Sequence, residues 1–246
     1  MTRRRWIADE FTADRAALVG AHAAHLARVL RAKPGQEFDI SVGESVRRGR
    51  VLSVSDDRVE FELGEHITVS ATARITAALG IFKFDRFEWA VEKLTELGVA
   101  EIVPLLASRT HPHLASAAAK RLERWRRLAL AAAEQSRRVT PPEIAEPVKL
   151  RQYGPPGQTI VLAESEEELA LKDALGPSSA DVVLAIGPEG GWTADELRWF
   201  AENGWKAVSL GRNILRAETA AIAATAIAMA ELQAKENARP KPGVAD

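Results

Sequence analysis

The residues best suited to chemistry lie near the C-terminal end of the chain, in two segments that combine polar side chains with glycine. Residues 186–193 have the sequence IGPEGGWT, and residues 210–220 have the sequence LGRNILRAETA. Because glycine has no Cβ and tolerates positive φ, the backbone N–H and C=O groups of such segments can approach a ligand closely. The polar side chains could bind the ligand, accept a proton or stabilise a negative charge; they are Glu189, Arg212, Asn213, Arg216, Glu218 and Thr219.

Each of these residues also has a simpler interpretation. The glycines could serve only as tight connections between strands and helices. Glu189 could fix its own loop by accepting backbone N–H bonds, and Glu218 is favoured by the helix dipole if it lies in the first turn of a helix. Thr219 could equally be a hydroxyl at a helix start. We prefer a ligand site because the polar groups are concentrated in two loops at the ends of predicted strands.

The elements around these segments can be predicted from the local pattern. Residues 182–186 form a continuous apolar run, as expected for a parallel strand covered on both faces. Residues 193–196 have the spacing of a capping box and predict a helix that ends near Gly204. A second strand is predicted over 207–210, and a long alanine-rich helix over 217–235. Each glycine segment therefore connects the carboxyl end of a strand to a helix.

A third loop of the same kind is predicted at residues 162–165, after a strand over 159–163. The pattern from residue 74 onward is α/β, with further strands and helices predicted over residues 75–81, 84–97, 101–106 and 115–138. Ligands in open α/β sheets bind at the carboxyl ends of strands, so the three loops predict one shared pocket. The sequences GxGxxG and GxxxxGK[ST] are absent, which argues against the usual dinucleotide and nucleoside triphosphate loops.

The predicted helix over 115–138 has an apolar stripe and a cationic face. The stripe consists of Leu122, Trp125, Ala129 and Ala132, and the other face carries Lys120, Arg124, Arg127, Glu134 and Arg138. A charged helix face is usually only the solvated face. Four cations against one carboxylate favour contact with RNA.

The first part of the chain, to about residue 72, has a different pattern. Short strands are predicted over 37–41, 46–54 and 58–63, with a turn at 55–57, which indicates a small β-barrel. This part carries many arginines, which as clusters fit phosphate contacts, although any one of them could be an ordinary surface charge. They include Arg4, Arg5, Arg28 and Arg31.

Composition limits the function independently. The 246 residues are 46% hydrophobic, carry a formal net charge of −1 and include no cysteine. The chain is long enough to bury a sizeable core, and its near-neutral charge means that any RNA contact must come from local basic patches. The absence of cysteine excludes disulfides, thiolate metal sites and a cysteine nucleophile. No apolar run approaches the roughly 20 residues that span a bilayer, so a cytoplasmic protein is expected.

Five segments together resemble one known family. Besides the two glycine segments they are HLARVLR at 25–31, VEKLTELGV at 91–99 and AEQSRR at 133–138. In this order they resemble the bacterial 16S ribosomal RNA uridine-N3 methyltransferases, a knotted SPOUT class that uses S-adenosylmethionine. The resemblance implies a PUA-like β-barrel RNA-binding domain over 1–72 and an α/β-knot methyltransferase domain over 73–246, with a disordered tail over 236–246.

The resemblance also implies a function and its partners. It implies that N3 of uridine 1498 in 16S ribosomal RNA of the small ribosomal subunit is methylated by a homodimer without a metal. A trefoil knot would hold the cofactor, which implies cofactor contacts at Leu162, Ala163, Glu164, Ile186, Gly187, Pro188, Gly190, Gly191, Leu210, Gly211, Asn213, Ile214, Leu215 and Thr219. RNA contacts are expected at Arg4, Arg5, Arg28, Arg31, Arg124, Arg127, Arg137 and Arg138. The alanine-rich helix after Glu218 could form the dimer contact or belong to the core.

The chemistry of uracil methylation suggests roles for three residues. Uracil N3 is a poor nucleophile while protonated, so the enzyme must help to remove this proton or stabilise the uracil anion. Arg216 is the first candidate for stabilising the anion, Glu189 is the candidate base and Glu218 is the second candidate base. Two alternatives stay open at this point: a ribose 2′-O-methyltransferase of the same class, and an RNA-binding assembly factor without catalytic activity.

Overall fold

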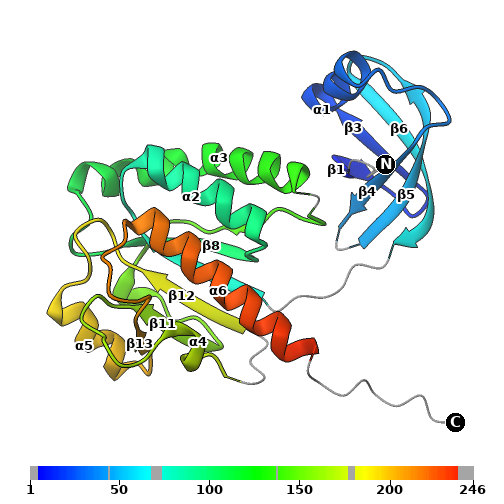
Figure 1. Ribbon diagram of the computed structural model, residues 1–246. Coiled ribbons are helices and arrows are strands. Elements are labelled where there is room, and N and C mark those ends of the chain that lie inside the picture. Colours follow the sequence, from blue (N-terminus) through cyan, green and yellow to red (C-terminus); the bar gives the residue numbers. More distant parts are fainter. Residues whose placement is uncertain (1–4, 44, 68–73, 137, 177–180, 238–246) are drawn as a thin grey trace, which may run out of the picture. The chain divides into compact units, whose positions relative to one another are not determined.

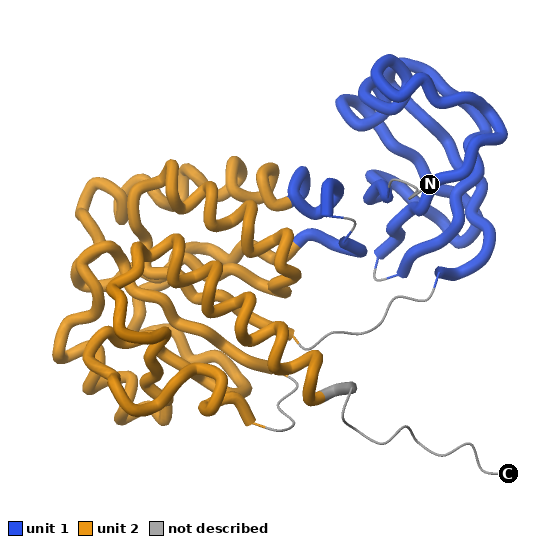
Figure 2. The backbone as a smooth tube through the Cα atoms, viewed as in Figure 1, with its two compact units in different colours: residues 1–71, 130–141 blue, residues 72–129, 142–246 orange. Residues whose placement is uncertain are grey.

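A computed structural model of the chain describes residues 5–43, 45–67, 74–136, 138–176 and 181–237 (Figure 1). The chain divides into two compact units, called unit 1 and unit 2 (Figure 2). Unit 1 consists of Met1–Ala71 together with Leu130–Pro141, and unit 2 consists of Thr72–Ala129 together with Pro142–Asp246. The division after Ala71 lies beside the predicted boundary at 72. The grouping of Leu130–Pro141 with unit 1 is not evident from the sequence.

Unit 1 is built on a six-stranded sheet that curls into a half-barrel of the PUA-like kind. The strand order is β1-β4-β5-β6-β3-β2, and all neighbours are antiparallel except β1 and β4. Alternate residues face a core that contains Trp6, Leu18, Ile40 and Phe61. The strands are β1 (Arg5–Ile7), β2 (Glu10–Phe11), β3 (Arg15–Val19), β4 (Glu37–Val42), β5 (Ser45–Val54) and β6 (Arg58–Ile67), and α1 (Gly20–Ala24) continues into a π-helical turn over His25–Val29.

Unit 2 contains a parallel sheet with the strand order β10-β8-β7-β12-β11-β13, in which β9 also pairs with β8. Every strand pair of this sheet is parallel, which confirms the α/β class. The strands are β7 (Arg74–Gly80), β8 (Glu101–Leu106), β9 (Glu143–Ile144), β10 (Val148–Lys149), β11 (Gln158–Leu162), β12 (Asp181–Ile186) and β13 (Lys206–Val208).

Four of the described helices lie close to the positions predicted for them. Gly98 ends α2 in the left-handed conformation with a φ of 101°, as glycine at this position allows. The helices are α2 (Phe84–Leu97), α3 (Pro112–Gln135), a 3₁₀ turn (Leu150–Gln152), α4 (Leu171–Ala174), α5 (Ala194–Glu202) and α6 (Ala217–Asn237). Helix α6 continues into the predicted tail through Asn237, and residues 238–246 lie outside the described residues.

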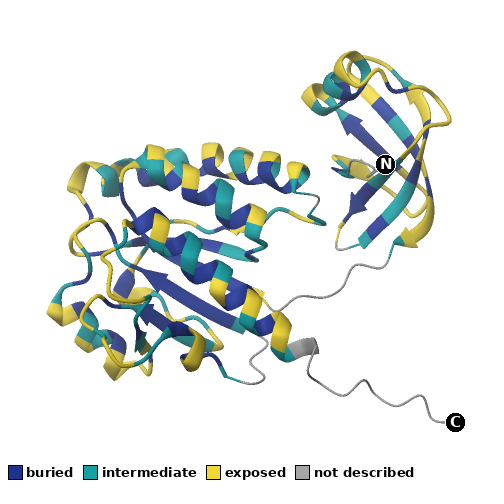
Figure 3. Ribbon diagram, viewed as in Figure 1, coloured by how far each residue is buried: buried dark blue, intermediate teal, exposed yellow. Residues whose placement is uncertain are grey.

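The sheet of unit 2 is buried on both faces, which explains the continuous apolar run of β12 (Figure 3). Leu184 and Ile186 share a core with residues of α2, α3, α4 and α6. Val183 and Ala185 face the opposite side, where they pack with Phe200 of α5 and its neighbours. Within the described residues, no helix is both long and apolar enough to cross a membrane.

The order of the last three strands creates a site between their ends. β11 lies between β12 and β13, so the chain crosses from one side of β11 to the other when it passes from β12 to β13. This is a topological switch point, where the loops at the carboxyl ends of the strands diverge and leave a crevice. The three loops that follow β11, β12 and β13 therefore begin side by side.

Candidate functional site

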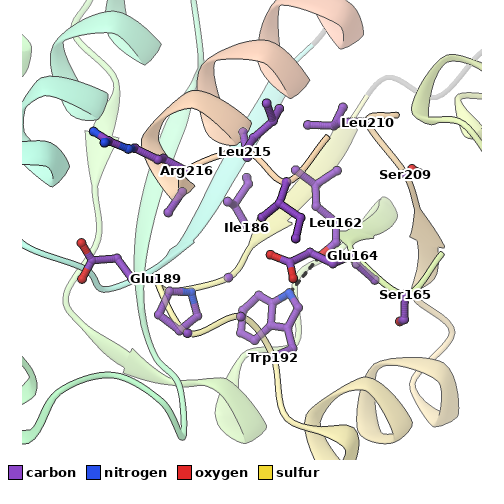
Figure 4. A pocket seen from close by; sticks show the side chains of 18 of the residues that line it. Leu162, Glu164, Ser165, Ile186, Glu189, Trp192, Ser209, Leu210, Leu215 and Arg216 are labelled. Carbon is purple, nitrogen blue, oxygen red and sulfur yellow. Dashed lines mark hydrogen bonds between the residues drawn. The ribbon is translucent and has the colours of Figure 1, made fainter. Parts of the chain in front are cut away.

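A pocket of about 530 Å³ lies at the carboxyl ends of β11, β12 and β13 (Figure 4). Its walls come from the three predicted loops: residues 162–165 after β11, residues 186–192 after β12, and residues 208–217 after β13. Its volume is in the range of sites for small molecules and cofactors. The sequence therefore correctly predicted one pocket shared by three loops.

Most of the predicted ligand residues line this pocket. They are Leu162, Ala163, Glu164, Ile186, Gly187, Pro188, Gly190, Gly191, Leu210, Gly211, Asn213, Ile214 and Leu215, together with the catalytic candidates Glu189 and Arg216. Thr219 and Glu218 are not among the lining residues. In Figure 4, Glu189 and Arg216 lie toward one end of the pocket, and Glu164 and Ser165 lie toward the other.

The loop after β12 is held in a sharp bend by its own backbone. The Gly191 N–H donates to the carbonyl oxygen of Pro188 over 2.8 Å, and Gly191 has a φ of 68°, which favours glycine. The Trp192 indole Nε1 donates to the carbonyl oxygen of Leu162 over 3.1 Å, so this loop is tied to the end of β11. The Trp192 ring packs edge-on against Phe200 with 4.9 Å between the ring centroids.

Helix α5 begins with the predicted capping box. The Thr193 hydroxyl accepts from the Glu196 N–H over 3.2 Å, and the Glu196 carboxylate accepts from the Thr193 N–H over 2.8 Å. The same carboxylate also accepts from the Ser108 N–H over 2.7 Å, although only 3% of Glu196 is exposed. Glu196 therefore anchors the helix start to the segment after β8 as well as capping the helix.

Arg109, in the segment between β8 and α3, supports residues 186–192 after β12, called the β12 loop below. Its Nη1 donates to the carbonyl oxygen of Gly190 over 2.6 Å and to that of Trp192 over 3.2 Å. Arg109 also lines the pocket. The sequence gives no signal for this role, because the dipeptide Ser108-Arg109 has no recognisable motif and lies about 80 residues before the loop that it contacts.

Arg86 of α2 contacts both predicted bases. Its Nη1 donates to Glu189 Oε1 over 3.1 Å, and its Nε lies 3.7 Å from Glu218 Oε1. The Glu218 side chain is 6% exposed, and its Oε2 has no hydrogen-bond partner among the described residues. Arg86 also lines the pocket and is not predicted from the sequence.

Arg216 differs from Glu189 and Glu218 because it is exposed and takes no part in an ion pair within the described part of the chain. It directly precedes α6, and no carboxylate in the described part of the chain forms an ion pair with it. Its guanidinium is therefore available to an anion that enters the pocket. Among the described residues, no group of three or more His, Cys, Asp or Glu side chains could hold a metal ion.

The arginines predicted to contact RNA occupy different environments. Arg31 and Arg127 are exposed, whereas Arg28 is paired with Asp56 over 2.7 Å and Arg124 with Glu88 over 2.7 Å. Burial lowers the pKa of the Arg138 guanidinium to about 10. Arg138 follows the end of α3 and is partly buried, so the predicted solvated face of that helix does not extend to it. Arg5 is partly exposed, and Arg4 and Arg137 lie outside the described residues.

The family of the chain follows from comparison with known proteins. A family model described as an RNA methyltransferase domain matches residues 69–229. A ribosomal RNA small subunit methyltransferase E from Rickettsia conorii is 32% identical over 220 residues, which cover 86% of this chain and 86% of that protein. The chain belongs to the ribosomal RNA small subunit methyltransferase E family. Another member, from Synechocystis, is 33% identical over 217 residues, which cover 85% of this chain and 71% of that protein.

Solved structures of the methyltransferase E family and related methyltransferases have the same fold. The ribosomal RNA small subunit methyltransferase E from Neisseria gonorrhoeae, bound to S-adenosyl methionine, matches with a TM-score of 0.81 and 30% identity over 92% of this chain and 96% of that chain. A methyltransferase from Legionella pneumophila, in complex with the bound cofactor SAM, matches with a TM-score of 0.79 and 27% identity over 94% of this chain and 98% of that chain. Both matches extend across units 1 and 2.

Proposed function

We propose that this protein transfers a methyl group from S-adenosylmethionine to N3 of a uridine in 16S ribosomal RNA of the small ribosomal subunit. Family membership supports methyl transfer to ribosomal RNA, and relatives of the same fold bind S-adenosylmethionine. The observation that carries the proposal is the pocket formed by the loops after β11, β12 and β13. The choice of uracil N3 rests on the resemblance of the sequence motifs to the uridine-N3 enzymes.

The lining of the pocket fits the donor. Leu162, Ile186, Leu210 and Leu215 provide an apolar wall suited to an adenine ring, and the glycine-bearing loops expose backbone groups that can bond its edge. Glu164 contributes an exposed carboxylate to the other end of the pocket, where it can attract a cationic ligand. When bound, S-adenosylmethionine supplies an electrophilic methyl group on a positively charged sulfur.

The protein must position uracil and stabilise its anion. Arg216 is exposed and has no ion-pair partner among the described residues, so we assign it to the carbonyl oxygens of the uracil anion or to a flanking phosphate. Glu189 lines the pocket as the candidate base, but proton transfer to it would weaken its bond to Arg86. If Glu189 is the base, the pH–rate profile of Glu189→Gln should no longer show the fall in rate on the acidic side. A profile of unchanged shape and reduced height would assign Glu189 to loop positioning instead.

Donor binding can be tested with a pair of charge reversals in one acidic run. Glu164 lines the pocket, whereas Glu167 is exposed three residues later and does not. Reversing a charge near a cation costs about 1–2 kcal/mol at contact distances in water, so Glu164→Lys should weaken S-adenosylmethionine binding about tenfold or more. Glu167→Lys should leave the dissociation constant unchanged in isothermal titration calorimetry. The absence of binding to the wild-type protein would refute the proposed cofactor.

The modified atom can be identified by nucleoside mass spectrometry after incubation with small subunits or 16S ribosomal RNA and labelled donor. We expect N3-methyluridine. A label on the ribose would establish a 2′-O-methyltransferase, and binding of RNA without any label would establish an assembly factor. Arg216→Ala should reduce turnover by about 100-fold or more while donor affinity is kept, and Arg216→Lys should recover part of it because the charge remains.

We infer that unit 1 binds RNA as a PUA-like domain and that the chain from β11 to α6 forms the knot of the class. Arg31 of unit 1 supports RNA binding by that unit because it is an exposed cation, and Arg127 is an exposed cation of unit 2 that could contribute a further phosphate contact. Their removal should reduce the salt dependence of RNA affinity, as expected for phosphate contacts. The reaction would take place in the cytoplasm, where small subunits are assembled.

We further infer that the protein works as a homodimer through the surface of α2 and α6. The two helices pack against each other, and their outer surfaces expose Trp89 (47%) and Ile227 (37%). By contrast, Met229 and Leu232 of α6 belong to the internal core, so they do not supply such a contact. Trp89→Glu should convert a dimer to a monomer in light scattering after size-exclusion chromatography, whereas a wild-type monomer would contradict the inference.

A further inference from the structure

Among the described residues, Arg86 is the only one at the pocket whose side chain contacts carboxylates from two separate segments of the chain. It is the third residue of α2, and its guanidinium reaches Glu189 in the loop after β12 and Glu218 in the first turn of α6. The two partners lie far from α2 in the sequence. A single side chain thus connects three elements that close one end of the pocket.

Because Glu218 is buried, loss of its ion pair with Arg86 should cost free energy. Glu218 is almost fully buried, and Arg86 is the cation that pairs with it within the described residues. A buried carboxylate is costly unless it is paired, so Glu218 holds Arg86 toward α6. Glu189 is 37% exposed and can move with its loop, so its bond to Arg86 restrains the loop.

The two carboxylates each lie beside pocket residues with separate roles. Glu189 is flanked by Pro188 and Gly190, which belong to the loop that we assign to the donor. Glu218 lies two residues after Arg216, which we assign to the uracil anion. The distance between the donor loop and Arg216 therefore depends on whether Arg86 holds both carboxylates.

We propose that Arg86 is a positioning residue of the methyl-transfer site, which aligns the donor loop with Arg216 by pairing with Glu189 and Glu218 together. The inference rests on the proposed function. Arg86 takes no part in the chemical step itself, since its guanidinium is engaged with the two carboxylates. Its loss lets the donor loop and the start of α6 move independently, which lowers the population of the aligned geometry.

The test compares Arg86→Met and Arg86→Lys with a matched control. Arg121→Met removes an arginine that pairs with Glu88 and lies over the Phe84 ring but does not line the pocket. For each variant the dissociation constant of S-adenosylmethionine, the kcat of methyl transfer and the thermal midpoint are measured. We expect Arg86→Met to lose about tenfold or more in kcat. Arg86→Lys should recover part of this loss, and Arg121→Met should retain the wild-type kcat.

A double-mutant cycle separates positioning from general destabilisation. If Arg86 acts through Glu189, the loss of kcat in Arg86→Met should shrink several-fold when it is introduced into Glu189→Gln, because the charge of the ion pair is already removed in that background. Full additivity of the two effects on kcat would overturn the proposal. If Arg86→Met does not fold, Arg86→Lys and Glu189→Gln still provide the comparison, since each keeps a polar side chain of similar length.

The possible outcomes distinguish this inference from the proposed function. A wild-type protein without methyl transfer would refute the function. A wild-type enzyme with normal turnover, together with an Arg86→Met variant of unchanged kcat, would refute the inference alone. A variant with only a lowered thermal midpoint, but wild-type kcat below that midpoint, would show that Arg86 has a purely structural role and would also overturn the inference.

Discussion

The substitution Gly80→Ala provides the most direct test of whether the position of the loop after β12 determines ligand binding. Gly80 ends β7, beside β12, and does not itself line the pocket. A Cβ at this position would lie 2.6 Å from both the backbone N and the Cδ of Pro188, and 3.0 Å from the carbonyl carbon of Gly187. The obstructing atoms belong to backbone and a proline ring, so no flexible side chain can move aside.

The size of the effect of Gly80→Ala follows from these distances. Carbon atoms pack at about 3.5 Å or more, so the loop must move by roughly 1 Å to accommodate the new methyl group. Overpacking of this kind costs about 1–3 kcal/mol. A shift of this size at a catalytic site can cost about 100-fold in rate. We therefore expect the dissociation constant of S-adenosylmethionine to rise about tenfold or more, with a comparable or larger loss of kcat.

The assay combines calorimetry with S-adenosylmethionine, methyl transfer to small subunits and thermal unfolding. Gly154→Ala is the matched control, because a Cβ at Gly154 would meet nothing within 4 Å and this glycine lies outside the pocket. It should leave all three measurements unchanged. A Gly80→Ala protein with wild-type affinity, wild-type kcat and an unchanged midpoint would refute the view that the close approach of β7 sets the loop position.

Three further predictions concern the contacts that hold this loop. Arg109→Ala removes the bonds to the carbonyl oxygens of Gly190 and Trp192 and should weaken donor binding about tenfold in calorimetry, while unchanged affinity would contradict this role. Trp192→Phe keeps an aromatic side chain but removes the indole N–H that donates to the carbonyl oxygen of Leu162, which should cost at least about 1 kcal/mol, or about fivefold in donor affinity; an unaltered dissociation constant would count against it. Glu196→Gln leaves buried N–H groups without a charged acceptor and should lower the free energy of unfolding by about 2 kcal/mol in urea titrations, whereas a loss below about 0.5 kcal/mol would show that the cap is dispensable.

The parts of the fold that the sequence predicted are those encoded by local patterns. The apolar run of β12 is continuous because both faces of the strand are covered. The Thr193 and Glu196 pair predicted the start of α5, and Gly98 predicted the end of α2. Each depends on residues within one or two turns, so the physical constraint is visible in a short window of sequence.

The pocket could be predicted because all three of its loops follow strands in the C-terminal half of the chain. The strand order could not, because nothing in the sequence of β11 shows that it lies between β12 and β13. Parallel pairing is set by how helices cover the two faces of the sheet, and that depends on the whole chain. The placement of Leu130–Pro141 with unit 1 was missed for the same reason.

The two arginines that hold the β12 loop could not have been found from local sequence at all. The loops of the pocket need glycine where the backbone has positive φ or approaches closely, so their chemistry restricts the sequence at each position. Arg86 and Arg109 act through long side chains that only have to reach a carboxylate or a carbonyl oxygen. Many sequence contexts can provide such a cation, so no motif forms around it. It follows that replacement of the loop glycines with positive φ should strongly disrupt the pocket, whereas substitutions of these two arginines should weaken its function in steps, with lysine intermediate between arginine and a neutral side chain.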